Sequence, residues 1–266
     1  MGPAKVWTDA GWAFVKPMAA DVNPHALAME LVCTRLAAWF GLPVLDTDIL
    51  TLGESDAFER RFNNPHTPPR SPARPGPALA TRAVEATRWD GTPEALAVLQ
   101  NPGDIALLVI FDTLVRNDDR YPPLNSEGHP MSSWGPNRGN VLLVREPSGA
   151  RTMRIVAMDF GRAVIGEGEL APRRLGINQT NEEWVYGLYP EFHRFVVPDV
   201  VDTAIERLNR LDRETVAGFV AQIPREWGVG AEAREALVDH LCRRARYLAD
   251  TIKSRLVQLC EGMPGW

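Results

Sequence analysis

The order of apolar and polar residues predicts β-structure followed by a helix at the start of the chain. Residues 5–16 place apolar positions on both sides of an Asp-Ala-Gly turn signal, which predicts a β-hairpin whose second strand ends at Lys16. Residues 24–40 follow Asn23, a favourable N-cap, and begin with a proline that suits the first helical position. They stop at a glycine, so we expect a helix bounded on both sides.

Three apolar stretches further along have the length of strands, and a fourth has the length of a buried helix. Residues 42–52, 140–144 and 152–159 are rich in leucine, isoleucine or valine and lie near turn-forming residues, which is typical of strands. Residues 105–115 are apolar on all sides and predict a core helix that ends before a charged loop.

Two polar stretches and a helical second half complete the pattern. Residues 61–77 combine proline, arginine and asparagine, which predicts a mobile insertion or exposed loop, and residues 121–138 are a second Pro/Gly/Ser-rich stretch. Beyond about residue 182, apolar residues recur at three-to-four spacing, most clearly in 200–211, 214–223 and 233–259. The expected fold class is α+β, with a β-rich first part and a mostly α-helical second part.

Composition narrows the classes of function. The chain has 266 residues, of which 45% are hydrophobic and 24% charged, as in an ordinary globular enzyme. Its formal net charge of −5 provides no general attraction to phosphate backbones or anionic lipid. We therefore expect neither nucleic acid nor a membrane as a direct partner.

Cysteine usage and hydropathy predict a cytoplasmic protein. Cys33, Cys242 and Cys260 are odd in number and far apart, which favours buried thiols in a reducing compartment over a disulfide framework or a metal knuckle. The first residues lack a basic segment followed by a long apolar core, and no apolar run approaches the roughly 18 residues of a membrane span. Neither secretion nor membrane insertion is expected.

Two charged residues in the first part have the spacing of a phosphate clamp. Lys16 ends an Ala-Phe-Val-Lys run, the pattern by which a strand delivers the phosphate-binding lysine of the kinase V-A-I-K motif. Glu30 lies in the next predicted helix, where its carboxylate can turn inward and pair with Lys16. Lys16 would hold nucleotide phosphates, and Glu30 would orient it.

Three polar residues in the second part complete the set that phosphoryl transfer requires. Asp119 follows the predicted core helix in a loop and is the candidate catalytic base. Asn140 precedes one predicted strand, and Asp159 begins a D-F-G at the end of the next, which makes these two the candidate magnesium ligands. Asn125 is the second choice for the asparagine ligand, because it lies nearer to Asp119 but is not followed by a strand.

These motifs together resemble the HipA-like kinase domain family. The resemblance rests on N-D-D-R at 117–120, G-N at 139–140 and D-F-G at 159–161, with similar character in 23–44 and in I-P-R-E-W at 223–227. It implies a protein-kinase-like, two-lobed fold that uses ATP and Mg²⁺. Its small β-rich N-lobe would comprise 1–100, with the Pro-rich insertion, and its larger, mostly α-helical C-lobe 101–266.

The chain departs from the usual kinase pattern in two places. Asn140 lies 21 positions beyond Asp119, so the stretch between them must loop out. No Gly-rich loop precedes Lys16, and only Gly2 and Gly11 are available to cover a nucleotide. Trp134 lies in the inserted stretch, where an aromatic side chain in a polar loop can face a partner or substrate.

The resemblance leaves several functions open. A protein serine/threonine kinase is the leading hypothesis, a small-molecule hydroxyl kinase the second, and a catalytically inactive nucleotide-binding module the third. Transfer of a nucleotidyl rather than a phosphoryl group would use the same metal site. The resemblance also allows for an antitoxin-like partner protein, which the residues themselves do not identify.

Overall fold

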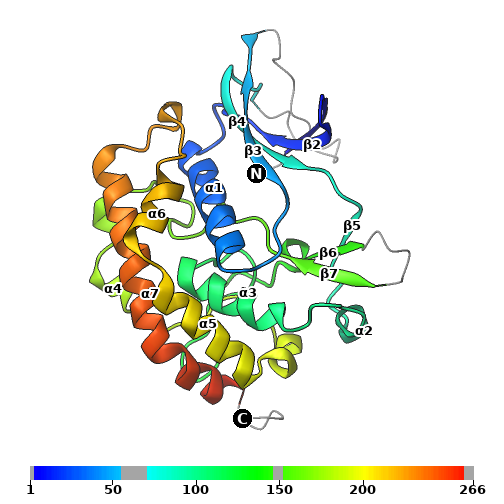
Figure 1. Ribbon diagram of the computed structural model, residues 1–266, viewed down its shortest axis with the longest axis vertical. Helices are drawn as coiled ribbons and strands as arrows, with labels where there is room; N and C mark the ends of the chain where they lie inside the picture. The colour runs from blue at the N-terminus through cyan, green and yellow to red at the C-terminus, as the bar shows by residue number, and fades with distance from the viewer. Residues whose placement is uncertain (1–2, 55–70, 146–151, 261–266) are drawn as a thin grey trace.

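Two antiparallel sheets organise the β-structure. The computed structural model describes residues 3–54, 71–145 and 152–260. The larger sheet has the strand order β1-β2-β4-β3, and the smaller has the order β5-β6-β7. Figure 1 shows the larger sheet at one end of the molecule and most of the helical mass at the other. The strands are β1 (Ala4–Thr8), β2 (Gly11–Lys16), β3 (Thr47–Leu52), β4 (Gly76–Arg82), β5 (Ala86–Arg88), β6 (Leu142–Arg145) and β7 (Met153–Val156).

Helices enclose the largest hydrophobic core. One cluster of buried side chains runs continuously from α1 and α3 to α5, α6 and α7, whereas a smaller cluster lies within the larger sheet. α1 contacts β3 as well as α6, so it joins the sheet to the helical part (Figure 1). The helices are α1 (Pro24–Trp39), α2 (Pro93–Ala97), α3 (Asp104–Val115), α4 (Ile177–Thr180), α5 (Pro198–Arg210), α6 (Arg213–Val220) and α7 (Ala231–Leu259).

The predicted hairpin and first helix are confirmed. β1 and β2 pair through a turn, with Gly11 at a φ of 105° that glycine adopts without strain. Asn23 caps α1, because its Oδ1 accepts a 3.0 Å hydrogen bond from the backbone N–H of His25. The core helix at 105–115 is confirmed as α3, in which every residue after the first is buried.

One strand is missing from the sequence-based prediction. The predicted loop at 61–77 is wrong at its end, because β4 begins at Gly76 and pairs with both β2 and β3. Residues 61–70 of that prediction lie outside the described residues. Local composition favoured a loop, but the neighbouring strands supply the hydrogen-bond partners that make residues 76–82 the centre of a sheet.

The second half agrees with its predicted helical periodicity. α5, α6 and α7 correspond to the three predicted segments, and β6 and β7 correspond to the two short apolar runs. The class is mixed α and β, with antiparallel sheets and helices. The division of the chain at residue 100 stays a prediction. None of the helices in the described ranges has the length and apolar content that crossing a bilayer requires.

Candidate functional site

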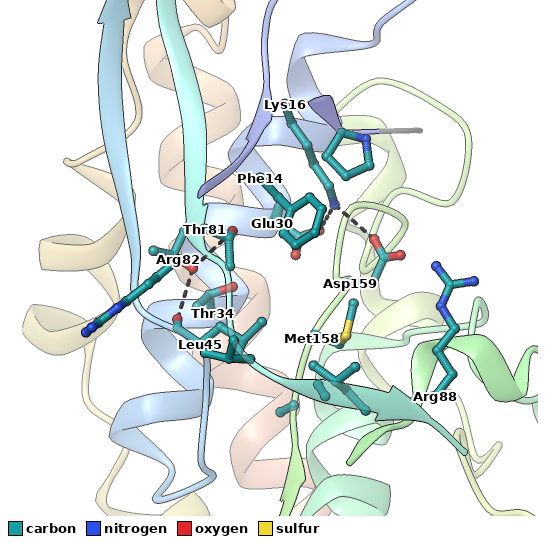
Figure 2. Close-up of a pocket in the computed structure, with 16 residues that line it drawn as sticks. Phe14, Lys16, Glu30, Thr34, Leu45, Thr81, Arg82, Arg88, Met158 and Asp159 are labelled. Atoms are coloured by element: carbon teal, nitrogen blue, oxygen red, sulfur yellow. Dashed lines mark hydrogen bonds and ion pairs between the residues drawn. The ribbon is translucent and has the colours of Figure 1, made fainter. Parts of the chain in front are cut away.

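A cavity of about 280 Å³ lies between the larger sheet and the strand β6. Its lining combines apolar side chains with a cluster of charged groups at one side (Figure 2). The apolar part is formed by Pro3, Phe14, Leu45, Val84, Ala86, Leu142, Ala157 and Met158, and the charged cluster by Lys16, Glu30 and Asp159. Two arginines and three threonines complete the lining: Arg82, Arg88, Thr34, Thr47 and Thr81.

Lys16 reaches the cavity because of the alternation of side chains along β2. Ala13 and Val15 are buried in the small core of the sheet, so Phe14 and Lys16 face the other way. The Lys16 Nζ donates to Glu30 Oε2 at 3.2 Å and to Asp159 Oδ1 at 3.1 Å. Burial alone would lower the pKa of Lys16, but the two carboxylates outweigh it and raise this pKa above its ordinary value.

Glu30 is a buried acid on α1. The helix is buried on most of its circumference, which leaves the Glu30 side chain only 10% exposed. Burial raises the pKa of Glu30, and the Lys16 ammonium partly offsets that shift. The carboxylate accepts a hydrogen bond from the Lys16 ammonium, the pairing that the sequence analysis expected, and a backbone hydrogen bond from Phe160 also lowers its pKa.

Asp159 adopts a backbone conformation that is uncommon for a residue other than glycine. Its φ of 60° lies in the left-handed region, three residues beyond the end of β7 at Val156. The next residue, Phe160, is fully buried and packs edge-on against Phe111 of α3, with ring centroids 5.3 Å apart. Burial would raise the pKa of Asp159, but Lys16 and the nearby arginine Arg120 lower it, so the carboxylate is held ionised.

Asp119 and Asn140 meet despite the long separation in sequence. The Asn140 Nδ2 donates to the carboxylate Oδ2 of Asp119 at 2.9 Å and to its carbonyl oxygen at 3.1 Å. Burial raises the pKa of Asp119, the charge of Asp159 raises it further, and the Asn140 hydrogen bond acts in the opposite direction. These shifts also indicate that Asp119 and Asp159 lie near enough to interact.

Asn125, the alternative candidate for the magnesium ligand, stabilises a turn. Its Oδ1 accepts hydrogen bonds from the backbone N–H groups of Glu127 at 3.0 Å and His129 at 2.9 Å. This arrangement closes a local loop in the inserted stretch. Asn140 is thus the asparagine that contacts Asp119.

The sequence analysis did not identify the buried ion pair that connects the segments of the candidate site. Arg120 is fully buried, and its Nε donates to Asp112 Oδ2 of α3 at 2.6 Å. The same guanidinium donates to the carbonyl oxygens of Asn140 and of Met158, the latter at 2.9 Å. It therefore joins the segments that carry Asp119, Asn140 and Asp159. An aspartate within the apolar run 105–115 was the available signal, because such a residue needs a buried partner.

Arg162 and Trp134 border the site on the side of Asp119. The Arg162 Nε lies 3.2 Å from Asp118 Oδ1 and 3.8 Å from Asp119 Oδ1. Its Cζ lies 5.8 Å from the centre of the Trp134 ring, which is a cation–π distance. Trp134 is 65% exposed, so the inserted stretch presents a large aromatic face beside the candidate base.

The donor set suits a magnesium ion that is shared with a nucleotide. Asp159 Oδ1 accepts from Lys16, which leaves Oδ2 for a cation, and Asn140 donates its amide N–H groups to Asp119, which leaves its amide oxygen. Mg²⁺ commonly binds one or two protein oxygens together with substrate phosphates and water. No cluster of three His, Cys, Asp or Glu able to hold a metal occurs in the described ranges, so these residues fit a shared ion and not a closed protein cage.

Gly11, one of the two glycines that the sequence analysis considered as cover for a nucleotide, lies in the β1–β2 turn. Gly2, the other glycine considered, lies outside the described residues. Whether this turn covers a nucleotide stays a prediction.

Comparison with known proteins gives a likeness of fold alone. No protein-family model matches the sequence, and no curated protein matches it. A solved structure of the Helicobacter pylori proinflammatory kinase CtkA is similar over 97% of this chain and 93% of its own, with a TM-score of 0.58 and 14% identity. A solved complex of Shewanella oneidensis HipA with HipB and operator DNA has a TM-score of 0.48 and 13% identity over 94% of this chain and 64% of that chain. The chain therefore has a kinase-like fold.

Proposed function

We propose that this chain is an ATP- and Mg²⁺-dependent phosphotransferase, and that it is a protein kinase acting on serine or threonine hydroxyls. The observation that carries the proposal is the position of Lys16, whose Nζ contacts Glu30 and Asp159 in a cavity that also has an apolar part. In kinases this lysine–glutamate pair and the D-F-G aspartate must be in place together. The kinase-like fold supports the same proposal.

The apolar and charged parts of the cavity would receive the two ends of a nucleotide. The apolar side chains Phe14, Leu142 and Met158 would pack against the base, and Lys16 would bind the phosphates. Glu30 would keep the Lys16 ammonium turned into the cavity. Asp159 and Asn140 would hold Mg²⁺, which when bound neutralises the charge of the phosphates.

Asp119 would accept the proton of the acceptor hydroxyl. Its raised pKa makes it a stronger base than an ordinary aspartate, and Asn140 fixes one carboxylate oxygen at 2.9 Å. Arg120 would act through these residues, since it binds the carbonyl oxygen of Asn140 and that of Met158, the residue before Asp159. It is a positioning residue.

The decisive first experiment is titration calorimetry of Mg-ATP into the wild type and into Asp159→Asn. Asparagine tolerates the left-handed backbone at this position, so the variant removes the charge and keeps the conformation. We expect Mg²⁺-dependent binding in the wild type and binding weaker by about tenfold or more in the variant, as for loss of a charged contact. Asp250→Asn, an exposed change on α7, is the matched control.

Equal Mg-ATP affinity in the wild type and Asp159→Asn would contradict the metal-site assignment. Circular dichroism of each variant excludes unfolding as the cause of a loss. Asp119→Asn tests the chemical step separately, because it should retain Mg-ATP binding and lose transfer by about 10²–10⁴-fold, the usual contribution of a general base.

A transfer assay with different acceptors distinguishes the possible reactions. A screen that compares protein with metabolite acceptors, using ³²P from the γ-position and from the α-position of ATP, separates protein kinase, small-molecule kinase and nucleotidyl transfer. Binding of Mg-ATP without any transfer would favour the inactive module. The antitoxin-like partner stays a prediction from the sequence resemblance.

A further inference from the structure

A second cavity, of about 340 Å³, lies against the segment that follows Asp159. It is separate from the cavity around Lys16, since no residue lines both. Arginine side chains dominate its charged lining. The residues are Arg116, Asp118, Val164, Ile165, Gly166, Arg173, Arg174, Gln179 and Tyr186.

Two of the charged groups in this lining are already paired. Arg116 donates two hydrogen bonds to the Glu182 carboxylate, from its Nε at 3.2 Å and from its Nη2 at 2.9 Å. Asp118 accepts two hydrogen bonds from Arg162, at 3.2 and 3.3 Å. Each pair is bidentate and holds a wall of the cavity in place, but contributes little net charge.

Arg173 and Arg174 give the lining of this cavity its net positive charge. They are consecutive, exposed residues of a short 3₁₀ turn, Pro172–Arg174. Within the ranges that the structure describes, neither guanidinium group forms an ion pair or a hydrogen bond to another side chain. Arg174 lies against Gly168, where an added Cβ would collide with the guanidinium, so the glycine leaves room for this placement. Among the described residues, the cavity therefore offers two guanidinium groups that form no ion pair.

The cavity adjoins the candidate base. Asp118 lines it, and Asp119 is the next residue. Arg162 contacts both, with its Nε 3.2 Å from Asp118 and 3.8 Å from Asp119. A molecule whose hydroxyl lies at Asp119 can therefore extend across Arg162 toward Arg173 and Arg174.

In residues 160–189, all of which the structure describes, no hydroxyl beside this cavity is free, since the Tyr186 hydroxyl donates to Glu182 at 2.6 Å. Thr180 is the only serine or threonine in residues 160–189, and it is buried with its hydroxyl bonded to the carbonyl oxygen of Gly176. Phosphorylation of this segment therefore does not supply an anion to the two arginines. We therefore look for this anion on a molecule that binds to the protein.

We propose that this cavity binds an anionic side chain of the acceptor, with Arg173 and Arg174 holding a carboxylate or phosphate group while the acceptor hydroxyl lies at Asp119. This inference rests on the proposed protein kinase function. It defines the acceptor class as a peptide segment with an acidic or phosphorylated residue near the serine or threonine that receives the phosphoryl group. Guanidinium groups suit both anions, because their donors match two oxygen atoms at once.

The test measures peptide binding and phosphoryl transfer side by side in the full chain. The probes are short fluorescent peptides with a central serine flanked by glutamate, by phosphoserine or by glutamine, and binding is followed by anisotropy with Mg²⁺ and a non-hydrolysable ATP analogue. The test variant is Arg173→Gln/Arg174→Gln. The matched control is Arg210→Gln/Arg225→Gln, which removes two exposed arginines that line neither cavity.

We expect the glutamate or phosphoserine peptide to bind the wild type about tenfold or more tightly than the glutamine peptide, as for one or two charge-assisted hydrogen bonds. That ratio should fall toward one in Arg173→Gln/Arg174→Gln and persist in the control. The stronger of the two anionic peptides identifies the carboxylate or the phosphate as the natural group.

The two proposals fail in different ways. A wild type that binds all three peptides equally, or a preference that survives in Arg173→Gln/Arg174→Gln, overturns the anion site even if transfer is detected. Tight, arginine-dependent binding without transfer to any peptide overturns the kinase proposal and leaves the anion site standing.

Discussion

Two clusters of oppositely charged side chains, one around Arg120 and one around Lys16, serve different purposes. Arg120 and Asp112 are fully excluded from solvent, and the arginine donates to carbonyl oxygens on two further segments. Lys16, Glu30 and Asp159 form a cluster that opens on a cavity, with the lysine side chain 18% and the aspartate side chain 33% exposed. The hydrogen-bonding groups of Arg120 all contact other protein groups, whereas Asp159 in the open cluster keeps its Oδ2 for a ligand.

This difference shows why burial alone does not identify a functional ion pair. A buried pair must satisfy all its hydrogen-bonding groups within the protein, which makes it a structural joint. An open cluster can exchange one of its partners for substrate or metal. Substitutions in the two clusters should therefore affect different measured quantities.

The largest effect is expected from Arg120→Met. It leaves the Asp112 carboxylate buried without its cationic partner, and removing one member of a buried pair costs about 3–5 kcal/mol of unfolding free energy. Urea denaturation measures the loss. Asp112→Leu/Arg120→Met should recover part of it, because no buried charge is then left unpaired. A single substitution that costs no more than Arg210→Gln, which removes an exposed pair with Glu206, would contradict the structural role.

A smaller loss of stability is expected from Lys16→Met. Glu30 and Asp159 lose their shared cation, which at neutral pH costs about 1–3 kcal/mol. Without Lys16 the folded-state pKa values of both carboxyls rise above their unfolded values, so the folded state binds protons more tightly. The stability deficit should therefore shrink as the pH falls from neutral toward 5.

Urea denaturation of Lys16→Met and wild type at both pH values checks this prediction, with Lys253→Met as an exposed control. A deficit that stays constant or grows on acidification would show that the carboxyls of Glu30 and Asp159 do not take up the missing charge.

The smallest effect is expected from Arg162→Gln on the pH dependence of phosphoryl transfer. Burial raises the pKa of Asp119, and Arg162 at 3.8 Å opposes that shift. Because transfer needs the ionised base, the wild-type rate should rise with pH through this raised pKa. Removing Arg162 raises the pKa of Asp119 further, so the acid limb of kcat/KM should move upward by up to about one pH unit.

The readout is the position of the acid limb and not the maximal rate, since Arg162 also contacts Asp118 and Trp134. Trp134→Ala removes the aromatic neighbour and retains the guanidinium, so it should leave the acid limb in place. An unchanged limb in Arg162→Gln would show that Arg162 does not control the ionisation of Asp119.

Local sequence signals predicted much of the fold. The turn before β2, the Asn23 cap of α1 and the apolar content of α3 are each determined by neighbouring residues, and the structure agrees at all three. β4 was missed because its stability comes from β2 and β3, which lie at a distance in sequence and supply hydrogen bonds on both sides. Long-range pairing of this kind leaves little local trace.

In the candidate site, too, some residues were identified from local sequence and others only from long-range contacts. Asn140 was chosen because it precedes a strand, and the structure places it against Asp119 across 21 positions of sequence. Arg120 was read only as part of a loop motif, whereas its side chain is a buried joint. The roles of all these residues in transfer stay predictions until the variants are measured.

The sequence by itself determined the types of element, the order in which the chemical groups occur and the face of β2 from which Lys16 projects, because these depend on short-range periodicity and capping. Only the tertiary structure decided the central place of β4, the contact between Asp119 and Asn140 and the pairing of Arg120 with Asp112. It also decided that Arg173 and Arg174 border a cavity beside the candidate base. Such contacts depend on which distant segments pack together, and that packing minimises buried unpaired charge and exposed apolar surface over the whole chain.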